Sequence, residues 1–185
     1  MLDFLRNINV SALVVCLTLP QLVGIVSAGL TRDNMKIIQQ IVKQPWFTPP
    51  AIVFPIVWPT LYFMMGVASY RVYTSTDNFT SLTSIPNSGN LVNNALFMYG
   101  IQLCFNFLWS IFYFGLGQIL MALIDGALLS FTIFLTMREF YTLDKPAGLM
   151  MIPYLAWSLF ALFLTINLYW LNGASVDLSN PTKQS

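Results

Sequence analysis

Histidine is absent from this chain, and charged residues are scarce, at 8% of the sequence. A typical soluble domain has about a quarter of its residues charged. With 57% hydrophobic residues and a mean hydropathy of +0.70, the composition excludes a water-soluble domain and predicts a protein whose main partner is the lipid bilayer. The net charge of +1 offers no basic face, so we expect no nucleic acid partner.

Cysteine is almost as rare as histidine. Only Cys16 and Cys104 occur, so the sequence predicts neither a disulfide framework nor a metal site of histidine and cysteine ligands. Both cysteines lie in apolar runs, where we expect small buried hydrophobic side chains. No pairing of a nucleophile with a base is present either, and the residues therefore predict a protein that is not an enzyme.

Long apolar stretches dominate the chain instead. About twenty apolar residues suffice to cross the hydrocarbon core of a bilayer, and the stretches cover about 8–30, 51–73, 94–114, 119–140 and 147–171. We predict an all-α integral membrane bundle of five transmembrane helices, forming a single domain over 1–174, with a polar, mobile C-terminal tail at 175–185. Pro20 and Gly24 inside the first stretch predict a kink or a close helix contact.

The connections between the stretches are mostly polar. Residues 31–44 place several isoleucines on one side of a short amphipathic helix, which we expect to pack over the mouth of the bundle. Residues 74–93 are rich in Ser, Thr and Asn and predict an exposed loop, in which Asn78-Phe79-Thr80 matches a glycan acceptor. The very short link 115–118 predicts antiparallel neighbours on its two sides.

Charge does not select an orientation in the membrane. Arg71, near the end of the second stretch, is expected to extend its charge to the interface. An odd number of spans divides the cations four against four, with Arg6, Arg71, Arg138 and Lys145 on one side and Arg32, Lys36, Lys43 and Lys183 on the other. The positive-inside rule therefore gives a tie.

Polar residues recur on one side of the third stretch. Gln102, Asn106, Trp109 and Tyr113 are spaced to share a helix face, and buried amides need partners, so this face is expected to lie toward the bundle interior. Asn106 could form an interhelical hydrogen bond or contact a ligand, and both roles stay open. Asp125 is the only carboxylate well inside a span, where a structural hydrogen bond and a place beside a cavity both stay open. A side-chain amide of Gln102 or Asn106 is its preferred partner.

The tryptophans divide by depth. Trp46 and Trp170 lie near span ends, where an aromatic belt is expected. Trp58 and Trp157 lie deeper, each close to prolines that loosen the backbone and help to define a pocket wall. Indole rings stack on planar ligands, so ligand contact and plain packing are the two alternatives for Trp58 and Trp157.

These residues resemble the translocator protein (TspO/MBR) family, also called tryptophan-rich sensory proteins or peripheral-type benzodiazepine receptors. The resemblance covers roughly 20–172 and includes motifs in all five spans, in order: Pro20-x-x-x-Gly24, Pro49-Pro50 through Phe54-Pro55-Ile56-Val57-Trp58, Gln102-x-x-x-Asn106-x-x-Trp109-Ser110, Ala122-Leu123-Ile124-Asp125, and Ile152-Pro153-Tyr154-Leu155-Ala156-Trp157. The chain departs from many animal members at Met121 and Thr165. It also has no cation in the five residues after Tyr169, where animal members carry a cholesterol motif.

The resemblance implies a receptor or translocator that requires no cofactor and binds a hydrophobic ligand, a porphyrin or heme-type tetrapyrrole or a sterol such as cholesterol. The expected cavity lies between the first, second and fifth helices, closed by 31–44. Its expected ligand-binding residues are Ala28, Phe54, Val57, Trp58, Asn106, Trp109, Met121, Ile124, Asp125, Leu128, Trp157, Ala161 and Leu164.

The resemblance leaves two alternatives to binding alone, transport of tetrapyrroles or sterols across the membrane and tryptophan-dependent porphyrin degradation. It also implies a multi-pass protein of the mitochondrial outer membrane in a eukaryote or of the cell envelope in a bacterium, and homodimers are common in the family.

Overall fold

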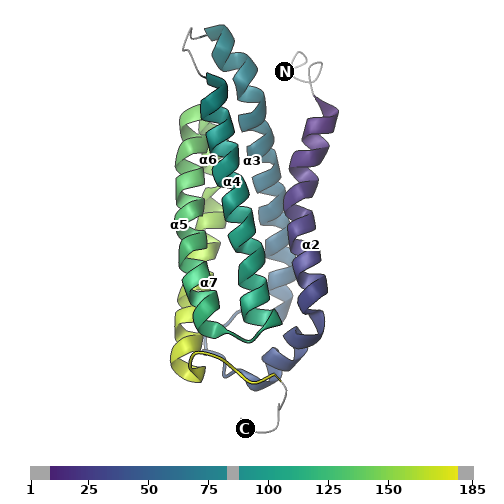
Figure 1. Ribbon diagram of the computed structural model, residues 1–185, viewed down its shortest axis with the longest axis vertical. Helices are drawn as coiled ribbons and strands as arrows, with labels where there is room; N and C mark the ends of the chain where they lie inside the picture. Colours follow the sequence, from purple (N-terminus) through teal and green to yellow (C-terminus); the bar gives the residue numbers. More distant parts are fainter. Residues whose placement is uncertain (1–8, 83–87, 179–185) are drawn as a thin grey trace.

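The chain forms a bundle of long, roughly parallel or antiparallel helices (Figure 1). The structure, a computed structural model, describes residues 9–82 and 88–178, and of the side chains of 76–88 nothing is described. The long helices are α2 (Val10–Ile41), α3 (Phe54–Leu82), α4 (Ser88–Ser110), α5 (Ile119–Leu143) and α7 (Ile152–Asn172). Short pieces join them: η1 (Ala51–Val53), the π-helical turn η2 (Ile111–Gly115) and α6 (Lys145–Met150).

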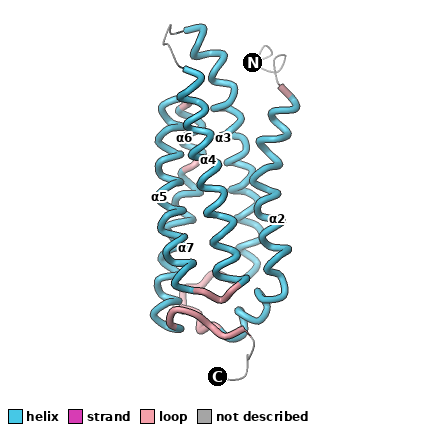
Figure 2. Tube along the Cα trace, in the orientation of Figure 1, coloured by secondary structure: helices cyan, strands magenta, loops and turns pink. Residues whose placement is uncertain are grey.

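The prediction of five membrane spans is confirmed. Five helical segments of the described chain are long and apolar enough to cross a bilayer, and helices joined by loops are all that Figure 2 draws. Five helices can cross lipid because each satisfies its backbone hydrogen bonds internally. The chain is thus a multi-pass helical membrane protein.

The helices pack in a fixed order. α4 packs on α5, as the short link between them predicted, and α5 packs on α7. α2 packs on α3, α4 and η2, but among the described residues no Cα atom of α2 lies within 8 Å of α5 or α7. The backbones of the first and fifth spans therefore stay apart, and only side chains near the end of α2 approach α7.

Buried apolar side chains form two clusters at different heights of the bundle. The upper cluster joins α3, α4, α5 and the α6–α7 region, and includes Met65, Ile133, Phe140 and Met151. The lower cluster joins the end of α2 to α5 and α7, and includes Ile38, Val42, Ile119, Leu164 and Leu168.

The first helix is longer than predicted. α2 runs on without interruption to Ile41 instead of ending near Leu30. Asn34 helps to hold this extension, because its Nδ2 donates a hydrogen bond to the carbonyl of Gly115, 2.7 Å away. The isoleucine pattern was nevertheless correct, since Ile38 and Val42 are buried in the lower cluster.

The predicted loop at 74–93 is wrong for most of its length. α3 continues to Leu82 and α4 begins at Ser88. Hydroxyl side chains do not end a helix when they bond to its own backbone, as Thr74 does to the Tyr70 carbonyl (3.1 Å) and Ser75 to the Val72 carbonyl (2.7 Å). The predicted glycan acceptor Asn78 therefore lies on helical backbone; its side chain and residues 83–87 lie outside the described residues.

An ion pair joins the upper end of the bundle. Arg71 donates from Nε and Nη2 to the two carboxylate oxygens of Asp144, at 3.0 and 2.9 Å. Asp144 also caps α6 by accepting from the Ala147 amide at 2.7 Å. The prediction that Arg71 extends toward the interface stays a prediction, and the structure adds Asp144 as its partner. Arg6 and Lys183, two cations of the orientation count, lie outside the described residues.

The lower end is closed by the segment that follows α7. The amide of Val176 donates to the Gly117 carbonyl at 2.9 Å, and the amide of Leu120 donates to the Ala174 carbonyl at 2.9 Å. Gly117 has φ +64°, and a Cβ there would lie 2.8 Å from the Val176 carbonyl oxygen, so this turn requires glycine. The tail is therefore docked as far as Leu178 rather than leaving the bundle at 175, and 179–185 lie outside the described residues.

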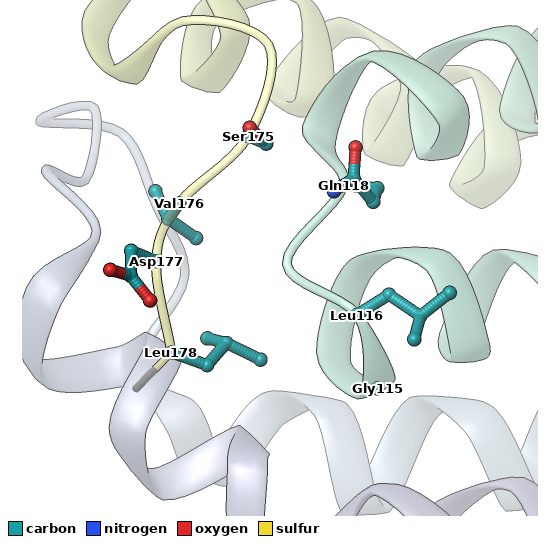
Figure 3. Close-up of a pocket in the computed structure, with 7 residues that line it drawn as sticks. All are labelled: Gly115, Leu116, Gln118, Ser175, Val176, Asp177 and Leu178. Carbon is teal, nitrogen blue, oxygen red and sulfur yellow. The ribbon is translucent and has the colours of Figure 1, made fainter. Parts of the chain in front are cut away.

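Figure 3 shows this docked segment facing the α4–α5 link, with Val176 and Leu178 on one side and Leu116 and Gln118 on the other. A shallow pocket of about 570 Å³ separates them.

The expectation of two buried cysteines is wrong, since Cys16 is half-buried and Cys104 is exposed. In a membrane an exposed apolar face meets lipid tails, so a small apolar side chain has no need of burial in protein.

Candidate functional site

The link between α2 and α3, residues 42–53, positions the start of α3 beside α7. Its beginning is tied to the end of α7, because the Lys43 amide donates to Asn172 Oδ1 (2.8 Å) and Asn172 Nδ2 donates to the Lys43 carbonyl (3.0 Å). Farther along, Phe47 stacks on Phe163 with ring centroids 5.3 Å apart. The link therefore follows α7 from its end toward its middle, which sets the height at which α3 begins.

Prolines set the local geometry at the start of α3. Pro50 precedes η1 in an extended conformation, and Pro55 lies in the first turn of α3, where a missing N–H costs nothing. Pro59 lies one turn farther on, and its carbonyl accepts a hydrogen bond from Gln21 Nε2 of α2 at 2.9 Å. The entry of the helix is thus stiffened by prolines and held from the side by α2.

Aromatic rings bridge α3 and α7. The rings of Phe54 and Trp157 meet edge to face with centroids 5.9 Å apart. The Trp58 ring lies 5.5 Å from that of Tyr62 and 6.3 Å from that of Tyr154. We call these five residues the aromatic seam. Trp58 and Trp157 are half-buried, and both pack against the upper cluster of the bundle.

Hydrogen bonds tie the aromatic seam to α4. The Tyr62 hydroxyl donates to Asn106 Oδ1 at 2.7 Å, and Asn106 Nδ2 donates to the Tyr154 hydroxyl at 3.1 Å. All three residues are buried. The predicted bond between Asn106 and Asp125 is wrong, because Asn106 bonds to the two tyrosines and Oδ2 of Asp125 has no partner among the described residues. Of the two roles left open for Asn106, the interhelical one is observed.

Several buried polar atoms close to this region have no hydrogen-bond partner among the described residues. They are both amide atoms of Gln102, Oδ2 of Asp125 and Nε1 of Trp157. Buried hydroxyls such as those of Thr136 and Thr165 differ, since each donates to its own helix backbone. Unpaired buried groups are rare and costly, and a bound ligand or water usually accounts for them.

Trp109 belongs to a separate group of rings. It stacks on Tyr113 with centroids 5.2 Å apart and packs against the lower cluster. A Cβ at Gly126 would lie 3.4 Å from the Trp109 ring, so this indole fills the space that the glycine of α5 leaves. Leu164 lies in the same lower cluster, and Ala161 is half-buried between the two regions.

Four of the predicted binding residues do not face the interior. Ala28 of α2 is exposed, and so are Met121, Ile124 and Leu128 of α5, at 49%, 51% and 45%. The inward face of α5 is the one that carries Asp125 and Gly126, and positions 121, 124 and 128 turn away from it. For these four residues the expectation of a shared cavity wall is wrong. Phe54 meets the Trp157 ring across the α3–α7 contact, and Val57, Trp58 and Trp157 pack against the upper cluster. Ligand contact by these four residues stays a prediction.

Sequence reasoning missed Tyr62 and Tyr154 as members of the site. A signal was present, because a tyrosine hydroxyl inside an apolar span needs a partner. Tyr62 follows Trp58 by one helical turn, and Tyr154 precedes Trp157 by about one turn. Within 9–82 and 88–178, no three histidine, cysteine or acidic side chains come together as metal ligands. The chemistry offered by this site is therefore ring stacking with a few hydrogen-bonding groups.

The fold and this site define a five-span helical membrane protein with an aromatic contact buried between two of its helices. The sequence model of the TspO/MBR family matches residues 16–171. The chain is 32% identical to the tryptophan-rich protein TspO of Chlorobaculum tepidum over 90% of this chain and 99% of that protein. It is 35% identical to the tryptophan-rich sensory protein of Cereibacter sphaeroides over 70% and 73%, respectively.

A mammalian relative aligns equally well. The translocator protein of Bos taurus is 32% identical over 82% of this chain and 84% of its own length. The chain therefore belongs to the TspO/MBR family. Membership supports a membrane receptor or translocator role for this chain.

Proposed function

We propose that this protein binds a planar tetrapyrrole of the protoporphyrin type at the aromatic seam. The observation that carries the proposal is the convergence of Trp58 and Trp157 with three further aromatic rings between α3 and α7. Flat aromatic rings gain stacking energy on a flat macrocycle in addition to the apolar area that they bury. The names of the relatives, tryptophan-rich sensory protein and translocator protein, are consistent with such a role.

Unpaired polar atoms add to the argument. The indole Nε1 of Trp157 is buried and has no hydrogen-bond partner in the part of the chain that the structure describes, and it lies in the same seam as the stacking rings. A ligand that carries hydrogen-bond acceptors at its edge would satisfy this donor, and a purely hydrocarbon ligand would not. A sterol is the weaker candidate, since the seam offers aromatic faces and the chain has no cation in the five residues after Tyr169.

The proposed ligand enters between α3 and α7. These two helices are joined mainly by rings, and the 42–53 link lies along α7 below them. Rotation of Phe54 and Trp58 would widen the contact without breaking a backbone hydrogen bond. Side-chain rotation of this kind is fast compared with helix movement.

The test is a titration of the purified full-length protein in lipid nanodiscs with protoporphyrin IX, followed by quenching of tryptophan fluorescence. We expect Trp58→Ala and Trp157→Ala each to weaken binding roughly tenfold, because each removes about 1 kcal/mol or more of ring contact. The remaining tryptophans keep the signal measurable.

Matched controls come from the same residue type. Trp46 and Trp170 are 95% and 79% exposed, so their replacement by alanine should leave the affinity unchanged. Circular dichroism shows whether each variant keeps its helices. Equal affinity in wild type, Trp58→Ala and Trp157→Ala would refute the proposed site, and equal loss in all four variants would point to nonspecific partition into the bilayer.

Binding must also be separated from transport and degradation. Flux of protoporphyrin into sealed proteoliposomes tests translocation, and loss of its absorbance under light with oxygen tests degradation. Binding at the seam predicts saturable quenching in the dark, whether or not either activity is found. Absence of saturation would contradict it.

A further inference from the structure

A second hollow lies at the upper end of the bundle, apart from the aromatic seam. It has a volume of about 300 Å³ and is lined by Phe134, Met137 and Tyr141 of α5, Leu149 of α6 and Ile152 of α7. Its accessible wall is entirely apolar. We call it the α5–α6 groove.

The floor of the α5–α6 groove is set by backbone contact. Gly148 lines it, and a Cβ on Gly148 would lie 2.5 Å from the Tyr141 Cα atom. α6 therefore rests directly on α5 at this point, and only glycine permits the approach. The groove is a built feature of the fold and not a gap between mobile side chains.

A cation borders this apolar groove. Arg138 lines the groove and is exposed. Since the accessible wall is apolar, Arg138 contributes its aliphatic stem, and its guanidinium lies at the rim. Lys145 is also exposed and precedes Gly148 by three residues, which places it on the same side of α6.

The acids nearby do not neutralise Arg138. Asp144 is held by Arg71 in the only ion pair found among the described residues. Glu139 follows Arg138 directly and so points about 100° away around the helix. Within 9–82 and 88–178 no ion pair joins Glu139 to a cation, so the charge of Arg138 at the rim is unmatched.

The depth of the groove suits a lipid. α5 has 25 residues, so it is about 37 Å long and exceeds the hydrocarbon thickness of roughly 30 Å. Arg138 lies in the last two turns of α5, from which its side chain reaches the headgroup level. Phe134, one turn deeper, lies among the acyl chains.

We propose that the α5–α6 groove is a selective site for one anionic phospholipid. An acyl chain lies along the apolar wall, and the lipid phosphate accepts hydrogen bonds from the Arg138 guanidinium, with Lys145 adding its charge. Arginine binds phosphate through two parallel N–H groups, which gives the contact a defined geometry. A zwitterionic lipid offers a phosphate already compensated by its own cation, and a sterol offers only a hydroxyl.

Native mass spectrometry of the purified full-length protein tests this proposal. The protein in nonionic detergent is titrated with dioleoyl phosphatidylglycerol or dioleoyl phosphatidylcholine, and the first binding event is measured for each. We expect phosphatidylglycerol to bind roughly thirtyfold more tightly, because Arg138 and Lys145 each contribute about 1 kcal/mol near the surface. Arg138→Gln should reduce this preference to about fivefold, the share of Lys145.

Two further variants distinguish the groove from general attraction of anions. Arg32→Gln removes an exposed arginine of α2 that does not line the groove and should retain the preference. Leu149→Trp fills the groove from an exposed position and should weaken the first phosphatidylglycerol several-fold while Arg138 is still present. Circular dichroism and protoporphyrin titration check that the bundle is intact in each variant.

Three outcomes would overturn the proposal. Equal binding of the two lipids by the wild type would show that charge is not selected. An equal reduction of the preference in Arg32→Gln and Arg138→Gln would assign it to net charge. Displacement of phosphatidylglycerol by cholesterol at lower concentration than by phosphatidylcholine would assign the groove to a sterol.

Discussion

α3 makes two kinds of contact with its neighbours, one toward α2 and one toward α7. Toward α2 the contact is made through glycine. A Cβ on Gly66 would lie 2.7 Å from the Cys16 carbonyl oxygen and 2.9 Å from the Leu17 Cα atom, and Gly24 lies against the ring of Tyr62. Toward α7 the contact is the aromatic seam, in which side chains span the distance.

The two contacts of α3 differ in the role that they suit, helix packing toward α2 and ligand binding toward α7. Without water to drive apolar association, helices in lipid gain stability from close approach, which small residues allow. The α2–α3 contact follows this rule and leaves no room for a ligand. In the α3–α7 contact the helices are bridged by rings instead, and a buried indole N–H there has no partner among residues 9–82 and 88–178. Stability should therefore depend on the first contact and ligand affinity on the second.

The largest effect is expected from Gly66→Ala. The new Cβ meets backbone atoms of α2, which cannot rotate away, so the helices must separate. We expect a loss of about 3 kcal/mol in the free energy of unfolding, measured by denaturant titration in mixed micelles with circular dichroism. Gly100→Ala is the matched control, because a Cβ there meets nothing within 4 Å. Similar losses in both variants would contradict the role of close packing.

Asn106→Leu should give the next largest effect. It removes both hydrogen bonds of the Asn106 amide and leaves the Tyr62 and Tyr154 hydroxyls buried. We expect a loss of about 1–2 kcal/mol in the same unfolding measurement, in line with interhelical hydrogen bonds in membranes. Tyr62→Phe combined with Asn106→Leu should then cost less than the sum of the two single changes. Strict additivity would argue that the bond contributes nothing.

Gln102→Leu should have a smaller effect of opposite sign. Gln102 lies one turn from Asn106 on α4, yet neither of its amide atoms has a partner in the described part of the chain. Replacing an unpaired buried amide by an apolar group of similar size should stabilise the bundle by about 1 kcal/mol. A destabilisation instead would mean that Gln102 binds an internal water or ligand, and porphyrin affinity measured on the same variant separates these two cases.

Phe54→Leu should change stability least. Phe54 is half-buried and contacts the Trp157 ring edge to face. We expect a stability loss below about 1 kcal/mol, together with a severalfold weaker affinity for protoporphyrin IX by fluorescence quenching. If Phe54→Leu lowered stability as much as Gly66→Ala and left the affinity unchanged, the α3–α7 contact would serve packing in the same way as the α2–α3 contact.

Much of the fold follows from local pattern. The five apolar runs predict five spans, because lipid leaves the backbone no other way to satisfy its polar groups. The spacing of Gln102, Asn106 and Tyr113 correctly predicts their burial, the first two in α4 and Tyr113 in the η2 turn that follows it. The short link at 115–118 correctly predicts the α4–α5 contact. The polar runs at 31–44 and 74–93 were misleading. The hydroxyls of Thr31, Thr74 and Ser75 donate to carbonyls of their own helices and allow these helices to continue.

The site was predicted less completely. Trp58 and Trp157 pack within the bundle, and their place in a pocket wall stays a prediction. The partner of Asn106 is a pair of tyrosines and not Asp125. Periodicity alone left the rotation of α5 undetermined, and Met121 and Ile124 face outward as a result. A shift of about 100° in the assumed rotation of a helix moves a residue from its inner face to its outer one.

The sequence by itself determined the class of protein, since a chain with low charge and five long apolar runs forms a bundle of five helices in a bilayer. It also determined which helices are joined by tight links and which residues are too polar to face lipid. Only the tertiary structure decided which α3 neighbour is packed by glycine and which by aromatic rings. The physical reason is that helix rotation and relative height depend on contacts among residues far apart in the chain, such as Tyr62 with Tyr154 through Asn106.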